Sequence, residues 1–113
     1  SWDRDEQAAE QIAHEQWRTN VFAPPVCWDL PTAEHFDVAA AHVRPQDVHA
    51  TVQISHDLGR HAAMLADLAE LGFDELYLHH VGTDQREFID AFGERVLPQV
   101  AEPAPGRDTG GRR

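Results

Sequence analysis

The sequence predicts an α/β fold with a pair of parallel strands, and three observations support this prediction. Residues 51–55 and 76–81 alternate apolar and polar side chains, which is typical of strands. A helical apolar pattern from Leu58 to Ala69 lies between them, and another up to Leu97 follows. A helix between two strands implies a right-handed crossover, so we expect the two strands to run parallel.

The first predicted element is a helix over 3–19. Asp3 and Glu6 have the spacing of a capping box, with Asp in place of Ser or Thr. The apolar residues that follow at helical spacing are Ala9, Ile12, Ala13 and Trp17. The opposite face is acidic and polar, so the pattern predicts a solvated amphipathic helix.

A proline-rich loop and a short helix are predicted next. Three prolines in eight residues exclude a helix over 21–31. This loop carries large apolar side chains, so we expect it to pack on the domain, line a pocket or meet a partner. Thr32 is expected to cap a helix that runs to about Val43 and ends before Pro45, with one further turn over 46–50.

Turn and cap signals delimit the elements of residues 51–100. Asp57 is expected to cap the helix that follows the first strand, and Gly72 to end it. Asp84 begins a capping box for the last helix, which Pro98 is expected to end.

These patterns divide the chain into 1–50, with helices and the proline-rich loop, 51–100, with the strand–helix–strand–helix unit, and a disordered tail over 101–113. Two strands are too few for a parallel sheet that hides its edges. We therefore expect the chain to be the end of a larger α/β protein, or to complete a sheet with other chains.

Composition limits the function classes. The formal net charge of −11 argues against binding to nucleic acid or to an anionic membrane. No apolar stretch approaches the roughly 18 residues of a transmembrane helix, and no secretory signal is evident. The single cysteine, Cys27, cannot form an internal disulfide, and its apolar surroundings favour a packed thiol. A cytoplasmic location is expected.

Eight histidines raise the question of a metal site. Those at 35, 42, 49 and 56 are spaced by seven, but Pro45 interrupts any continuous helix through them. His79 and His80 are adjacent in a predicted strand, so their side chains point to opposite faces. We therefore predict no metal site and assign no catalytic nucleophile.

Two stretches of the chain resemble a known superfamily. Ser55-x-Asp57 at a strand end, and GFDELYLHHVGTDQREFIDAF…VLPQ over 72–99, resemble the C-terminal part of the luciferase-like flavin- and F420-dependent oxidoreductases. The family's turn positions are His79, Gly82, Asp84 and Gln85 in this chain. The upstream stretch EQWRTNVFAPPVCWDLPTAEHFD resembles the flavin-type branch of the same group.

The resemblance implies the last two β/α units of a TIM-type (β/α)8 barrel, with 51–55 as the seventh strand and 76–81 as the eighth. It implies FMN or coenzyme F420 in the intact family. Barrel active sites lie at the C-terminal ends of the strands. The implied cofactor-binding residues are therefore Ser55, Asp57, His79 and Gly82. Ser55 and Asp57 are also well placed as ordinary helix caps.

The segment before the first strand is similar to the family's segment that covers the barrel mouth. The resemblance implies substrate contacts from Trp17, Arg18 and Trp28, and the alternative for these residues is ordinary packing. His49 and Ala50 stand where members that oxidise sugar phosphates carry basic residues, which does not favour a sugar phosphate.

The function expected from the resemblance is that of a C-terminal fragment of an oxidoreductase. The intact enzyme would carry out hydride transfer or monooxygenation of a small organic substrate, and the chain by itself is expected to be inactive and not to bind the cofactor tightly. A homo-oligomer is a further expectation. The alternative is a non-catalytic acidic interaction module that completes a partner's sheet.

Overall fold

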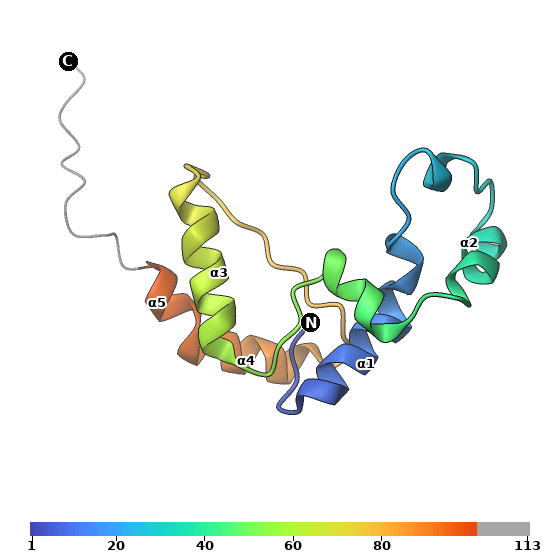
Figure 1. Ribbon diagram of the computed structural model, residues 1–113. Helices are drawn as coiled ribbons and strands as arrows, with labels where there is room; N and C mark the ends of the chain where they lie inside the picture. The colour runs from blue at the N-terminus through green and yellow to red at the C-terminus, as the bar shows by residue number, and fades with distance from the viewer. Residues whose placement is uncertain (102–113) are drawn as a thin grey trace, which may run out of the picture.

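The computed structural model describes residues 1–101, and within this range the chain is helical and contains no β-strand. The α-helices of this range are α1 (Glu6–Trp17), α2 (Ala33–Ala40), α3 (Leu58–Glu70), α4 (Gln85–Arg95) and α5 (Leu97–Ala101). Shorter 3-10 turns cover Arg18–Asn20, Val26–Trp28 and Pro45–Ala50. Figure 1 shows α3, α4 and α5 on one side of the molecule, α1 near its centre, and α2 with the proline-rich loop on the other side.

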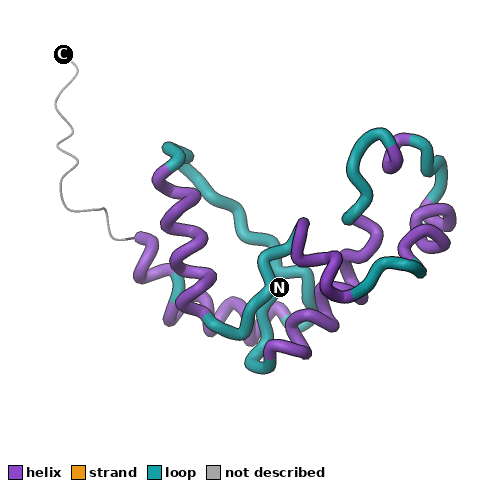
Figure 2. The backbone as a smooth tube through the Cα atoms, in the orientation of Figure 1, coloured by secondary structure: helices purple, strands orange, loops and turns teal. Residues whose placement is uncertain are grey.

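The predicted α/β fold, a partial TIM-type barrel, is wrong for the described residues. The segments 51–55 and 76–81 are loops that form no ladder with each other (Figure 2). Residues 53–55 and 76–81 are extended, whereas the Thr51 and Val52 amides both donate to the Val48 carbonyl in a turn. Within 1–101, the first segment makes strand-like bonds to a single residue: the Ser1 nitrogen donates to the Gln53 carbonyl at 2.7 Å, and the Ser55 amide donates to the Ser1 carbonyl at 3.3 Å. A strand requires such bonds to repeat along a neighbour, and these two segments lack one.

Helix ends agree better with the sequence prediction. A side-chain oxygen caps each of three helices as predicted, with Thr32 at α2, Asp57 at α3 and Asp84 at α4. Gly72 follows α3 with a φ of 91°, a left-handed conformation that glycine adopts without a Cβ clash. The last turn predicted before the first extended segment is present over Pro45–Ala50.

Three predicted boundaries need correction. The carboxylate that caps α1 belongs to Asp5, not Asp3, because Asp3 accepts a bond from the Asp5 amide and so lies outside the helix. Helix α2 ends at Ala40, short of Val43. Pro98 lies in the first turn of α5, where its missing amide costs no helical bond. Residues 102–113 of the predicted tail lie outside the described residues.

Two apolar clusters hold the described chain together. One joins α3 and α4 to the N-terminus through Trp2, Ala62, Leu65, Phe92 and Val96. The other joins α1 to the 3-10 turn over 45–50 and the first extended segment through Ala9, Ala13, Val48, Val52 and Ile54. The first extended segment is therefore part of the core, although it is not a strand.

Candidate functional site

A cavity of about 220 Å³ lies where the two extended segments meet α1, α3 and α4. Most of its wall is apolar or aromatic. It is lined by Ser1, Trp2, Trp17, Thr51, Val52, Gln53, His61, Met64, Leu65, Leu78, His79, His80, Val81, Phe88 and Phe92. Both extended segments contribute more than one residue to its wall.

His80 is held in this wall by an aromatic neighbour and by a glycine. Its side chain stacks on Phe88 with ring centroids 4.4 Å apart and planes 5° apart. A Cβ on Gly82 would lie 2.6 Å from the His80 Nε2, so the absence of a side chain at Gly82 leaves room for the imidazole. His80 Nδ1 is buried and has no hydrogen-bond partner among the described residues. Gly82 is thus a positioning residue for His80.

His61 is the second buried histidine of the cavity, and its sequence signal was only its place in the apolar face of a helix. Its Nε2 lies 3.0 Å from the carbonyl oxygen of Ser55, to which it donates as a neutral ring. Burial lowers the pKa of His61, and burial likewise lowers the pKa of His80. Both rings are therefore neutral at pH 7, and neither offers the cavity a permanent positive charge.

Ser55 and Asp57, both predicted cofactor ligands, are occupied by local structure. Ser55 is 1% exposed, and its Oγ accepts the Asp57 amide at 3.1 Å. The Asp57 carboxylate accepts the Gly59 amide at 2.7 Å and caps α3. Their polar groups fix the turn into α3, so the structure favours the capping role for both residues.

The remaining predicted residues divide into two groups. Trp17 and His79 come together across the cavity wall, with ring centroids 5.1 Å apart in an edge-to-face arrangement. Arg18 lies in the 3-10 turn after α1 and does not line this cavity. Trp28 is 76% exposed in the turn over 26–28 and also lies outside it. The structure therefore assembles the Trp17–His79 pair but not the predicted substrate trio.

The described residues do not form a complete site for a flavin or deazaflavin. A volume of about 220 Å³ is below the roughly 300 Å³ at which pockets for cofactor-sized ligands begin. The wall carries no arginine, and its buried histidines are neutral, so it lacks a counter-charge for a phosphate. The aromatic wall is suited to contact one part of a planar ligand, and the rest of the contacts would have to come from elsewhere.

A second, more open cavity of about 570 Å³ lies along α4. Its charged lining mixes Arg4, Arg86 and Arg95 with Asp84, Glu87, Asp90 and Glu94. Arg4 is already paired with Glu87. Carboxylates outnumber guanidinium groups there, so this surface does not favour a phosphate either.

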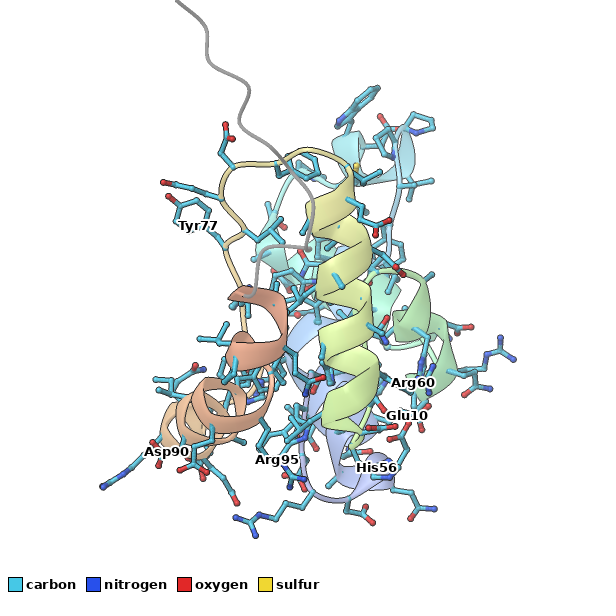
Figure 3. The ribbon with its side chains drawn as sticks, turned by 90° about the vertical axis from the view of Figure 1, so that its left-hand side faces the viewer. Glu10, His56, Arg60, Tyr77, Asp90 and Arg95 are labelled. Atoms are coloured by element: carbon cyan, nitrogen blue, oxygen red, sulfur yellow. The ribbon has the colours of Figure 1, made fainter. Side chains whose placement is uncertain are left out.

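The histidines of the N-terminal half act as hydrogen-bonding groups. His14 bonds the Val43 carbonyl at 2.8 Å, and His49 contacts Glu10 at 2.8 Å. His56 contacts Glu6 at 2.6 Å, on the same side of α1 as Glu10 (Figure 3). Among residues 1–101, no three His, Cys, Asp or Glu side chains are arranged to hold a metal ion. In the same range, no helix combines the length and apolar character needed to cross a membrane.

Comparisons with known proteins give one partial similarity. No protein-family model matches the chain. Over 47 residues it is 36% identical to an F420-dependent glucose-6-phosphate dehydrogenase of Microbacterium testaceum. This match covers 42% of the chain and 14% of the length of the dehydrogenase. The chain is thus related in sequence to an oxidoreductase over a short stretch, and that stretch is a small part of the related enzyme.

Proposed function

We propose that this chain is one part of a luciferase-like, F420- or flavin-dependent oxidoreductase that acts on a small organic substrate by hydride transfer or monooxygenation. The observation that carries the proposal is the 36% identity to the F420-dependent dehydrogenase over 47 residues. When bound, the cofactor would supply the redox chemistry, and the protein would position it.

We further propose that the chain does not catalyse alone. The cavity is too small for the cofactor and holds no phosphate counter-charge, which supports this view. Apolar side chains that a complete domain would cover are exposed, including Leu71, Phe73 and Leu97. The role of this chain's own residues is then to supply an aromatic wall, Trp17 with His79 and His80 with Phe88, to a site that other polypeptide completes.

The substrate of the proposed enzyme is not expected to be a sugar phosphate. The one basic-type side chain at the predicted position is His49, and its Nε2 lies 2.8 Å from the Glu10 carboxylate, a negative charge that disfavours a phosphate there.

A chimaera tests the relationship. The matched 47-residue stretch of the Microbacterium dehydrogenase is replaced by the corresponding stretch of this chain, and F420 binding is measured by fluorescence. We expect a Kd within about tenfold of the parent enzyme, a loss of no more than about 1.4 kcal/mol. A chimaera that keeps the parent's circular dichroism and mass but does not bind F420 would contradict the proposal.

Titration of the purified chain with FMN and with F420 tests whether it needs other polypeptide to bind a cofactor. We expect neither FMN nor F420 to bind with a Kd below about 1 mM, the weak end of specific recognition. Micromolar binding of either cofactor by a monomer would show that the chain has a complete site and would overturn this part of the proposal.

A further inference from the structure

Within residues 1–101, most of the backbone of the second extended segment has no hydrogen-bond partner, although the His80 carbonyl accepts a bond from the Gln85 side chain. Among residues 1–101, no amide from Phe73 to Asp84 donates a hydrogen bond to another residue, and no carbonyl from Phe73 to His79 accepts one. Figure 2 shows this segment as a long loop between α3 and α4. An extended run of free amides and carbonyls is the feature by which a sheet edge recruits another strand.

The side chains of the same segment are largely uncovered. Tyr77 is 90% exposed and points away from the helices, as Figure 3 shows. Leu78 is exposed as well, and beside it an apolar cavity of about 270 Å³ is lined by Leu65, Leu76, Leu78, Leu97 and Val100. A strand laid along this segment would find backbone partners on its edge and an apolar recess for alternate side chains.

The charge around this surface has one sign. Residues 66–81 contain four carboxylates and neither lysine nor arginine; the carboxylates are Asp67, Glu70, Asp74 and Glu75. All four are exposed. A second copy of the chain would bring the same acidic charge to the contact, so complementarity favours a basic partner over self-pairing.

We propose that residues 74–81 form a docking edge for an extended peptide with alternating apolar side chains and basic residues at its ends, bound by strand addition. This inference concerns the chain without the polypeptide that the proposed function needs to complete its domain, and it does not depend on a cofactor. The chain already uses the same bonding elsewhere, because Ser1 exchanges two backbone hydrogen bonds with Gln53 and Ser55 in the pattern of one residue of a parallel pair.

The probe is a synthetic peptide of about seven residues, a typical strand length, with alternating Val and Thr and a Lys pair at each end. Its matched control carries Glu in place of every Lys. Binding to the full chain is measured by calorimetry, and strand formation by the amide I infrared band. We expect the Lys peptide to bind at least about tenfold more tightly than the Glu peptide and to raise the β signal.

Two variants separate backbone pairing from side-chain contact. Tyr77→Pro removes one amide from the edge, and Tyr77→Ala removes the exposed ring but keeps the amide. We expect Tyr77→Pro to raise the Kd for the Lys peptide by at least about tenfold, and Tyr77→Ala to raise it by much less. The helical circular dichroism of each variant shows that it is folded.

A charge variant covers the case in which Tyr77→Pro does not fold. Asp74→Asn combined with Glu75→Gln is expected to abolish the preference for the Lys peptide over the Glu peptide. The proposal is overturned if both peptides bind equally to the unmodified chain, if neither binds, or if folded Tyr77→Pro binds as well as Tyr77→Ala. It is also overturned if the chain dimerises through this edge and the peptide does not compete.

Discussion

The two extended segments have the same sequence pattern, but they differ in burial and in backbone hydrogen bonding. In residues 51–57, Val52 and Ile54 are buried, and the backbone bonds to Ser1 and to the His61 side chain. In residues 73–84, most side chains are exposed and the amides have no partner within 1–101. The same alternating pattern therefore occurs in a segment that packs into the core and in one that does not, so the availability of a neighbour decides whether such a segment is stabilised.

The largest expected effect comes from removing apolar volume from the first segment. Ile54→Ala should lower the free energy of unfolding by about 2 to 5 kcal/mol, because a buried side chain leaves a cavity. The matched change in the second segment, Tyr77→Ala, should alter it by no more than about 0.5 kcal/mol. Urea denaturation followed by circular dichroism measures both, and equal losses would contradict the difference between the segments.

Gly82→Ala tests how tightly the end of the second segment is held. The new methyl would lie 2.6 Å from His80 Nε2, and the ring is stacked on Phe88. The substitution should therefore lower the free energy of unfolding by about 1 to 3 kcal/mol. Gly93→Ala in α4 has no atom within 4 Å of the added methyl and should stabilise the helix by about 0.5 to 1 kcal/mol. Thermal unfolding would refute this if both changes had the same sign.

The next prediction concerns the helix caps that follow the two segments. Removing them should change the free energy of unfolding by different amounts, and this difference is smaller than those above. Asp57 accepts the Gly59 amide at 2.7 Å, whereas Asp84 accepts the Glu87 amide at 3.4 Å. Replacing Asp57 by Ala should cost about 1 kcal/mol, and replacing Asp84 by Ala should cost less. Chemical denaturation of the two variants measures this order. A larger loss for the Asp84 variant would contradict the order expected from the two hydrogen-bond distances.

The smallest expected effect is a pH dependence of the unfolding free energy through His61 of α3, which holds the first segment by its bond to the Ser55 carbonyl. Burial lowers the pKa of His61 below its usual 6.5 in the folded chain, so the unfolded chain takes up the proton first as the pH falls. The stabilisation by neutral His61 is complete above about pH 6.5 and is lost as the pH falls through the lower, folded pKa.

His61→Gln keeps a side-chain donor but does not titrate, so its unfolding free energy should fall less between pH 7 and pH 5 than that of the unmodified chain. The Ser1 amine, whose pKa burial lowers to about 6, titrates in both proteins, and its charge also lowers the pKa of His61, so the difference between the two profiles includes this coupling. Identical pH profiles would exclude a buried neutral His61.

Local signals in the sequence predicted local features well. Thr32, Asp57 and Asp84 cap helices as expected, because a cap depends on the few residues that follow it. The alternation in 51–55 and 76–81 predicted strands, and this prediction was wrong, because a ladder depends on residues distant in sequence.

The candidate site was predicted only in part. The resemblance selected Trp17, His79 and Gly82, which lie at or beside the cavity, but also Trp28, which is exposed and lies outside it. His61 was missed because a histidine within an apolar helical face gives the same pattern as a core residue. Its role depends on the Ser55 carbonyl, which only the fold brings near.

Amide hydrogen exchange of the isolated chain tests the difference between the two segments most directly. We predict that the Ser55 amide, bonded to the Ser1 carbonyl, exchanges slowly, and that the amides of 74–81 exchange at nearly the rate of an unstructured peptide. Addition of the Lys peptide should then slow alternate amides of 74–81. Slow exchange throughout 74–81 in the isolated chain would show that this segment is already paired, which would contradict both the contrast between the segments and the proposed docking edge.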